Sequence, residues 1–153
     1  MKKKSIKAQL EEITAKHPGL NNRQIKVIRD GIKSGVDVSI YADPKFNSDQ
    51  MTQLYEGLTR GIDVSAYADP RYSTMQMYQI KFGLLNGYDV SIYADPKFSW
   101  EQMHQLVYGI SAGVDVRAFS KPEISEKEMK QKIEDFMKEE YLKNTANGNR
   151  QVA

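Results

Sequence analysis

Residues 61–70 read GIDVSAYADP, and this ten-residue pattern occurs four times in the chain. The other copies are GVDVSIYADP at residues 35–44, GYDVSIYADP at residues 87–96 and the more divergent GVDVRAFSKP at residues 113–122. Successive copies are 26 residues apart, and a fixed period of about 20–50 residues is the signature of a repeat protein. A unit of this length cannot cover its own apolar face, so we expect neighbouring units to stack.

The segment that precedes each copy carries the start and stop signals of a helix. An Asn or Ser is followed three residues later by Gln, which is the capping-box pattern that satisfies two backbone donors. Each segment ends at the glycine that opens the next ten-residue pattern, and glycine adopts the left-handed conformation at little cost. The sequence therefore predicts helices near residues 22–34, 48–60, 74–86 and 100–112.

Each ten-residue copy predicts a short 3₁₀ turn between two helices. An Asp caps the turn and a proline ends it, and we expect the following Val and aromatic residue, such as Val64 and Tyr67, to be buried. A second glycine recurs inside each helix, as at Gly57, where it costs about 1 kcal/mol of helix propensity relative to alanine. Its recurrence predicts close approach of the tyrosine.

Both ends of the chain have the composition of solenoid caps. The fold prediction is all-α: a short α-solenoid of four helix plus short-turn (3₁₀) repeats with capping helices at both ends. We divide it into an N-terminal capping helix at 1–17, the repeats at 18–124, a C-terminal capping helix at 125–144 and a disordered tail at 145–153.

Composition narrows the environment of the protein. The 153 residues include no cysteine, 22 Lys and Arg, and 20 Asp and Glu. A chain without cysteine fits a reducing compartment, and no apolar run reaches the roughly 18 residues of a membrane span. We therefore expect a cytoplasmic protein that does not enter a membrane.

Candidate catalytic residues are few. The repeated acids occur in every unit at turn and cap positions, where Asp has a local backbone role, whereas an active site is built once. His17 and His104 lie far apart in sequence and outside any metal-ligand pattern. No Gly-rich phosphate loop is present. We expect no enzyme activity, no metal and no cofactor.

Positions that differ between units are where a function can be written on a repeated scaffold. One stripe of the first two helices is polar, but in the third and fourth it becomes aromatic. The predicted partner-binding residues, expected to form one contiguous patch, are Met75, Tyr78, Phe82, Trp100, His104 and Tyr108. Exposed aromatic patches mark interfaces, although the same residues would be core if they packed beneath the C-terminal helix.

The units at residues 47–72 and 73–98 resemble a Tyr-Ala-Asp-Pro repeat, with Gln-Met, Gly-Leu and Gly-Val-Asp-Val-Ser elements, in proteins of bacterial mobile elements and phages that have no established activity. The resemblance covers about residues 18–125. It implies a phage or mobile-element context, in which small proteins often block a host machine. We therefore expect a protein–protein interaction module that inhibits a host defence complex, in the manner of an anti-CRISPR or other anti-defence protein, inside the host cytoplasm.

Two other hypotheses remain open. The first is direct nucleic-acid binding along a basic groove with aromatic stacking platforms. Its candidate cations are Lys2, Lys3, Lys4, Lys7, Lys26, Arg29, Lys33, Lys45, Arg60, Arg71, Lys81 and Lys97. The interspersed acids weaken this hypothesis. The second is a structural protein that self-associates, as a homodimer, through the aromatic patch or an end cap.

Overall fold

A computed structural model describes residues 2–151, with side chains up to residue 148. Over these residues, the regular secondary structure consists of α-helices and of the 3₁₀ turns between them, without strands. The order is α1 (Ile6–Lys16), α2 (Asn22–Ser34), η1 (Val38–Ile40), α3 (Ser48–Thr59), η2 (Val64–Ala66), α4 (Thr74–Leu85), η3 (Val90–Ile92), α5 (Trp100–Ser111), η4 (Val116–Ala118) and α6 (Glu126–Gln151). The four predicted repeat helices are confirmed to within one residue.

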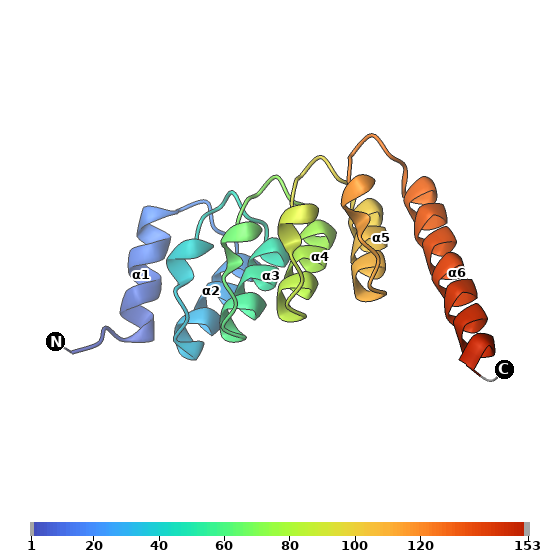
Figure 1. The fold of residues 1–153 in the computed structure, drawn as a ribbon. Coiled ribbons are helices and arrows are strands. Elements are labelled where there is room, and N and C mark those ends of the chain that lie inside the picture. The colour runs from blue at the N-terminus through green and yellow to red at the C-terminus, as the bar shows by residue number, and fades with distance from the viewer. Residues whose placement is uncertain (1, 152–153) are drawn as a thin grey trace. The chain divides into compact units, whose positions relative to one another are not determined.

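The chain forms two compact units, one ending at Gly87 and the other beginning at Tyr88. In the first unit, α1, α2, α3 and α4 pack on one another in chain order (Figure 1). In the second unit, α5 packs on α6. Each of the helices α2 to α6 is followed or preceded by a 3₁₀ turn, so the all-α helical-repeat class, that of the α-solenoids, is confirmed.

Capping boxes begin the helices α2 to α5, as predicted. In α3, the Asn47 side chain accepts a hydrogen bond from the Gln50 backbone N–H at 2.8 Å, and the Gln50 side-chain oxygen accepts one from the Asn47 N–H at 2.8 Å. The chain then leaves each helix through a left-handed glycine, and Gly61 has a φ of 73°. Most other residues would be strained in that conformation, which explains the repeated glycine.

In the first two repeats, the 3₁₀ turn places a tyrosine against the helix that precedes it. Tyr67 is fully buried, and its hydroxyl donates a hydrogen bond to the Gln53 carbonyl of α3 at 3.0 Å. A Cβ atom on Gly57 would overlap this hydroxyl and would lie 2.8 Å from the Val64 side chain. The predicted close approach is therefore confirmed, and it requires a glycine in α3. Tyr41 repeats the arrangement on Gly31 of α2.

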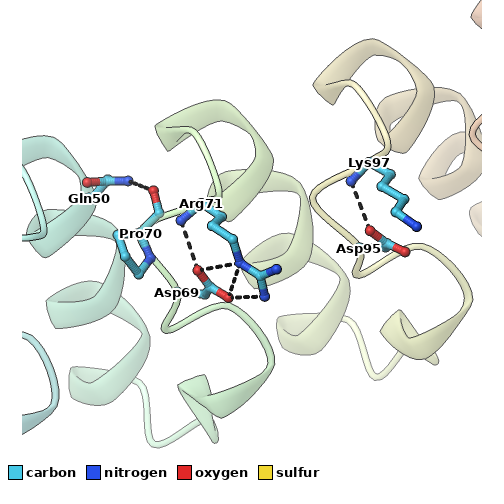
Figure 2. Close-up of polar contacts among 6 residues, drawn as sticks. All are labelled: Gln50, Asp69, Pro70, Arg71, Asp95 and Lys97. Carbon is cyan, nitrogen blue, oxygen red and sulfur yellow. Dashed lines mark hydrogen bonds and ion pairs between the residues drawn. The ribbon is translucent and has the colours of Figure 1, made fainter.

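The glutamine of the capping box has a second role that the sequence analysis missed. The Gln50 side-chain amide donates to the carbonyls of Pro70 and Tyr72, at 3.1 and 2.7 Å, in the loop that leads to the next helix. Figure 2 shows the bond to Pro70. Gln102 makes the equivalent bonds, at 2.8 and 2.6 Å, to the loop before α6. One side chain thus caps its own helix and also fixes the entry to the next.

α6 begins like a fifth repeat. The Ser125 hydroxyl accepts the Glu128 N–H at 3.2 Å, and Met129 and Ile133 are buried. The capping-box position holds Glu128 in place of the glutamine of the earlier helices, and Glu has no amide to donate onward. Residues 139–148, at the register of the ten-residue pattern, read EEYLKNTANG, so no loop of the repeat type follows for this side chain to hold.

The C-terminal end of α6 differs from the prediction. Glu139 stands at the register of the terminating glycine Gly113, so no left-handed residue ends the helix, and α6 continues to Gln151. The Thr145 hydroxyl donates to the carbonyls of Tyr141 and Leu142, each at 3.0 Å, within this extension. Residues 145–151 of the predicted disordered tail at 145–153 are thus helical in the structure, and residues 152–153 lie outside the described residues.

The tyrosine contact predicts that Gly57→Ala lowers stability although alanine is the better helix former. The new methyl group displaces the Tyr67 ring, and we expect a loss of about 2 kcal/mol in the free energy of unfolding, measured by urea denaturation. Gly148→Ala is the matched control, because nothing lies within 4 Å of that helical glycine. Adding Tyr67→Phe to Gly57→Ala should recover part of the loss, and equal stability of Gly57→Ala and wild type would refute this packing role.

The two sets of hydrogen bonds made by Gln50 predict that Gln50→Glu destabilises the protein, whereas the reverse change at Glu128 does not. A glutamate keeps the oxygen that accepts the capping-box hydrogen bond. It replaces the amide NH₂ group, which donates to Pro70 and Tyr72, by a carboxylate oxygen that faces their carbonyl oxygens. We expect a loss of about 2–3 kcal/mol at pH 7, measured by urea denaturation. The loss should shrink at pH 4, where the protonated carboxyl regains one donor. The reverse change, Glu128→Gln, should be nearly neutral at pH 7, and a Gln50→Glu variant as stable as wild type would show that the inter-repeat bonds contribute nothing.

Candidate functional site

In the first unit, α4 presents an aromatic surface where α2 and α3 are polar. Met75, Tyr78 and Phe82 of α4 are each more than one-third exposed, and the Tyr78 and Phe82 rings stack with centroids 6.4 Å apart. At the registers of these two rings, α2 carries Lys26 and Asp30, which form an ion pair at 2.8 Å. The surface of this unit therefore changes from charged to aromatic along the stack.

A buried ion pair lies beside the two stacked rings. The side chain of Lys81 is only 6% exposed, and its ammonium group is paired with Glu56 of α3 and lies 5.6 Å from the centre of the Tyr78 ring. The hypothesis that Lys81 lines an exposed basic groove was therefore wrong. The register alone gives a mixed signal, because it holds the core residues Val107 and Ile133 but also the exposed Arg29.

In the second unit, α5 carries the other half of the predicted residues. Trp100, His104 and Tyr108 are exposed along this helix. The Tyr108 hydroxyl lies 3.8 Å from the Met137 sulfur of α6, so this ring contacts the C-terminal helix while 45% of it remains exposed. At the registers of His104 and Tyr108, α6 carries an ion pair of Lys130 and Glu134, at 3.8 Å.

The sequence analysis missed an apolar extension of this surface on α6. Phe136, Met137 and Tyr141 are all more than one-third exposed, and they line an open concavity beyond the C-terminal end of α5. They were assigned to a capping helix with a single covered face. Phe136, Met137 and Tyr141 continue, at helical spacing, the apolar stripe that begins with Met129 and Ile133. α5 ends at Ser111, before it can cover this part of the stripe.

The predicted site residues therefore fall into two sets, three on α4 in the first unit and three on α5 in the second. All six are exposed in the structure. In each unit one helix carries an ion pair, on α2 and on α6, at the registers where another helix carries aromatic rings.

The repeated acids have local backbone roles. The carboxylates of Asp69 and Asp95 accept the backbone N–H groups of Arg71 and Lys97, two residues on, each at 2.9 Å (Figure 2). Hydrogen bonds from the Arg71 side chain and backbone lower the pKa of Asp69 below its usual value. The carboxylates of the second series cap the 3₁₀ turns, as Asp63 does by accepting the Ser65 N–H at 3.0 Å.

Other groups that could support chemistry are scattered or sequestered. Among residues 2–151, no three His, Asp or Glu side chains gather closely enough to hold a metal ion. Burial raises the pKa of the Tyr41, Tyr67 and Tyr93 hydroxyl groups above the usual range, so they remain neutral in the core. No helix in the described part of the chain has both the length and the apolar character to cross a membrane.

Comparison of the chain with known protein families, curated proteins and solved structures finds no match. The arrangement of the side chains is therefore the basis for a functional proposal.

The Lys81–Glu56 pair predicts opposite effects for its two partners. Glu56→Gln leaves the buried ammonium without its carboxylate and should lower the free energy of unfolding by about 1–2 kcal/mol, because Glu56 is half-exposed and water screens part of the cost. Lys81→Met removes the charge from a core-like register and should be neutral or stabilising. Urea denaturation checks both, and a Lys81→Met variant less stable than Glu56→Gln would contradict the assignment of the pair as structural.

Proposed function

We propose that this protein is a non-enzymatic protein–protein interaction module that binds through the aromatic residues of α4 and α5. The observation that carries the proposal is the exposure of Tyr78 and Phe82 in the first unit and of Trp100 and Tyr108 in the second, at registers that α2 and α3 fill with polar side chains. Folding does not require aromatic rings at these positions, because the repeats with polar side chains there build the same helix.

The side chains support binding more than catalysis. Trp and Tyr provide large contact areas at a low entropic cost and dominate interface hot spots. The acids that recur in each repeat serve turns and caps, and His104 lies among exposed aromatic side chains with no described hydrogen bond to an acid. These contacts favour an inhibitor or adaptor over an enzyme.

The proposed partner is a protein complex of bacterial defence in the host cytoplasm, which the protein would bind and occlude. This part of the proposal rests on the resemblance of the Tyr-Ala-Asp-Pro repeat to proteins of phages and mobile elements. Self-association through the same rings is the competing use of this surface.

A triple variant tests the proposal. Tyr78→Ser, Trp100→Ser and Tyr108→Ser together should abolish complex formation in affinity capture from host lysate, while the helical circular dichroism and the melting temperature remain close to wild type. The matched control changes three polar residues at the Tyr78 register of other helices, Lys26→Ser, Thr52→Ser and Lys130→Ser, and should retain binding.

Three outcomes would refute the proposal or change it. Unfolding of the aromatic variant would identify these rings as core. Equal capture by both triple variants would place the binding surface elsewhere. Light scattering that shows a wild-type dimer, and a monomer only for the aromatic variant, would assign the surface to self-association.

A further inference from the structure

Positive charge is concentrated in the N-terminal segment of the chain, although the net charge of the whole chain is small. Residues 1–34 contain nine Lys and Arg against three Asp and Glu, whereas the remaining residues contain 13 Lys and Arg against 17 Asp and Glu. The N-terminal segment, which includes α1 and α2, thus carries a formal charge of +6 within a chain of net charge +2. Charge concentrated in this way produces a local positive field that the composition of the whole chain does not reveal.

The cations of α2 gather on one exposed face. Lys26, Arg29 and Lys33 follow at the helical steps of three and four residues, and all three are exposed. Asp30 is the single acid of this helix. Asp30 forms an ion pair with Lys26 at 2.8 Å, and a hydrogen bond from Lys26 lowers the pKa of its carboxyl. No ion pair is described for Arg29 or Lys33, so these three cations and one acid leave the face with a formal charge of +2.

The positive surface extends toward α1. Lys7 of α1 and Arg29 of α2 both line the groove between these helices. Lys7 has a loose ion pair with Glu11 at 3.9 Å, and no ion pair is described for Arg29. Both side chains can therefore turn toward a ligand at little cost.

Several basic residues of the later repeats lie beside acids. Arg71 is paired with Asp69 at 2.7 Å, Arg117 with Asp115 at 2.8 Å, and Lys45 lies 3.8 Å from Asp43. Lys81 is buried, whereas Arg60 and Lys97 are exposed and have no described ion pair. Among the helices α2 to α5, only α2 carries at least three cations, so the positive charges of the repeats are most closely spaced at their N-terminal end.

The chemistry of the α2 face favours a nucleic-acid backbone over an acidic protein. A protein interface needs an apolar centre, but the exposed residues of α2 are all polar: Asn22, Arg23, Lys26, Arg29, Lys33 and Ser34. A phosphate backbone needs only closely spaced cations, and both Arg and Lys bind phosphate oxygens.

We propose that the face of α2 formed by Lys26, Arg29 and Lys33, with Lys7 of α1, binds the phosphate backbone of a nucleic acid without reading its sequence. This site is separate from the aromatic surfaces of the proposed function and does not depend on them. The nucleic acid would be a second ligand of the protein, and the release of its counterions would supply most of the binding free energy.

Fluorescence anisotropy with a labelled 20-base-pair DNA duplex tests this site on the full chain. The affinity of wild type should fall steeply between 50 and 200 mM salt. In Lys26→Gln/Arg29→Gln/Lys33→Gln, the loss of three phosphate contacts should lower the slope of log affinity against log salt by about 2.7, so the fall over this range should be about 40-fold smaller. An unrelated duplex sequence should bind wild type equally well.

The matched control is Lys127→Gln/Lys130→Gln/Lys138→Gln, which removes the same charge from α6. It should bind the duplex like wild type, and circular dichroism should show both variants folded. The proposal fails if wild type shows no salt-dependent binding or if the α6 control loses as much affinity as the α2 variant. It also fails if polyglutamate of equal total charge displaces the duplex as well as unlabelled DNA does, because the face would then recognise acidic protein chains.

Discussion

The burial of a tyrosine against a glycine of the preceding helix, as for Tyr41 on Gly31 and Tyr67 on Gly57, is the contact on which the fold depends. Tyr67 fits over Gly57 because a Cβ at that position would occupy the place of its hydroxyl, and the hydroxyl in turn satisfies a carbonyl of α3. The contact ties the 3₁₀ turn to the helix and so fixes the direction in which the next helix begins. The glutamine of the capping box then secures that next helix from the other side, through the carbonyls of Pro70 and Tyr72.

These contacts use backbone atoms and a small set of side chains. The exposed side chains at the registers of Tyr78 and Phe82 do not take part in them. Lys26 and Asp30 in α2 and Tyr78 and Phe82 in α4 occupy the same registers on helices that start, stop and pack alike. The scaffold tolerates either chemistry, so the aromatic choice reflects something other than folding. Lys81 is less free to vary, because its side chain is buried and its charge needs Glu56 as a partner.

Sequence reasoning predicted the features that local chemistry determines. Asn47 and Gln50 specify a helix start, and Gly61 specifies its end, because each acts on backbone groups within a few residues. It missed features set by distant neighbours. The onward bonds of Gln50 reach residues 20 and 22 positions away, and the burial of Lys81 depends on Glu56 in another helix. The exposed stripe of α6 was missed because it depends on where α5 ends. All six predicted site residues are exposed, and their role in binding stays a prediction.

The first and last described helices differ in chemistry. α1 has no fully buried side chain and carries lysines, and the basic face of α2 follows it. α6 buries Met129 and Ile133 and then continues past its neighbour, because Glu139 replaces the terminating glycine and Asp135 stands at the register of Gly109, where the earlier helices accept a neighbouring turn. Loss of the glycines thus ends the repeat series and lengthens the helix. The same substitutions therefore leave Phe136 and Tyr141 uncovered, so the exposed apolar stripe of α6 is a direct consequence of how the repeat series stops.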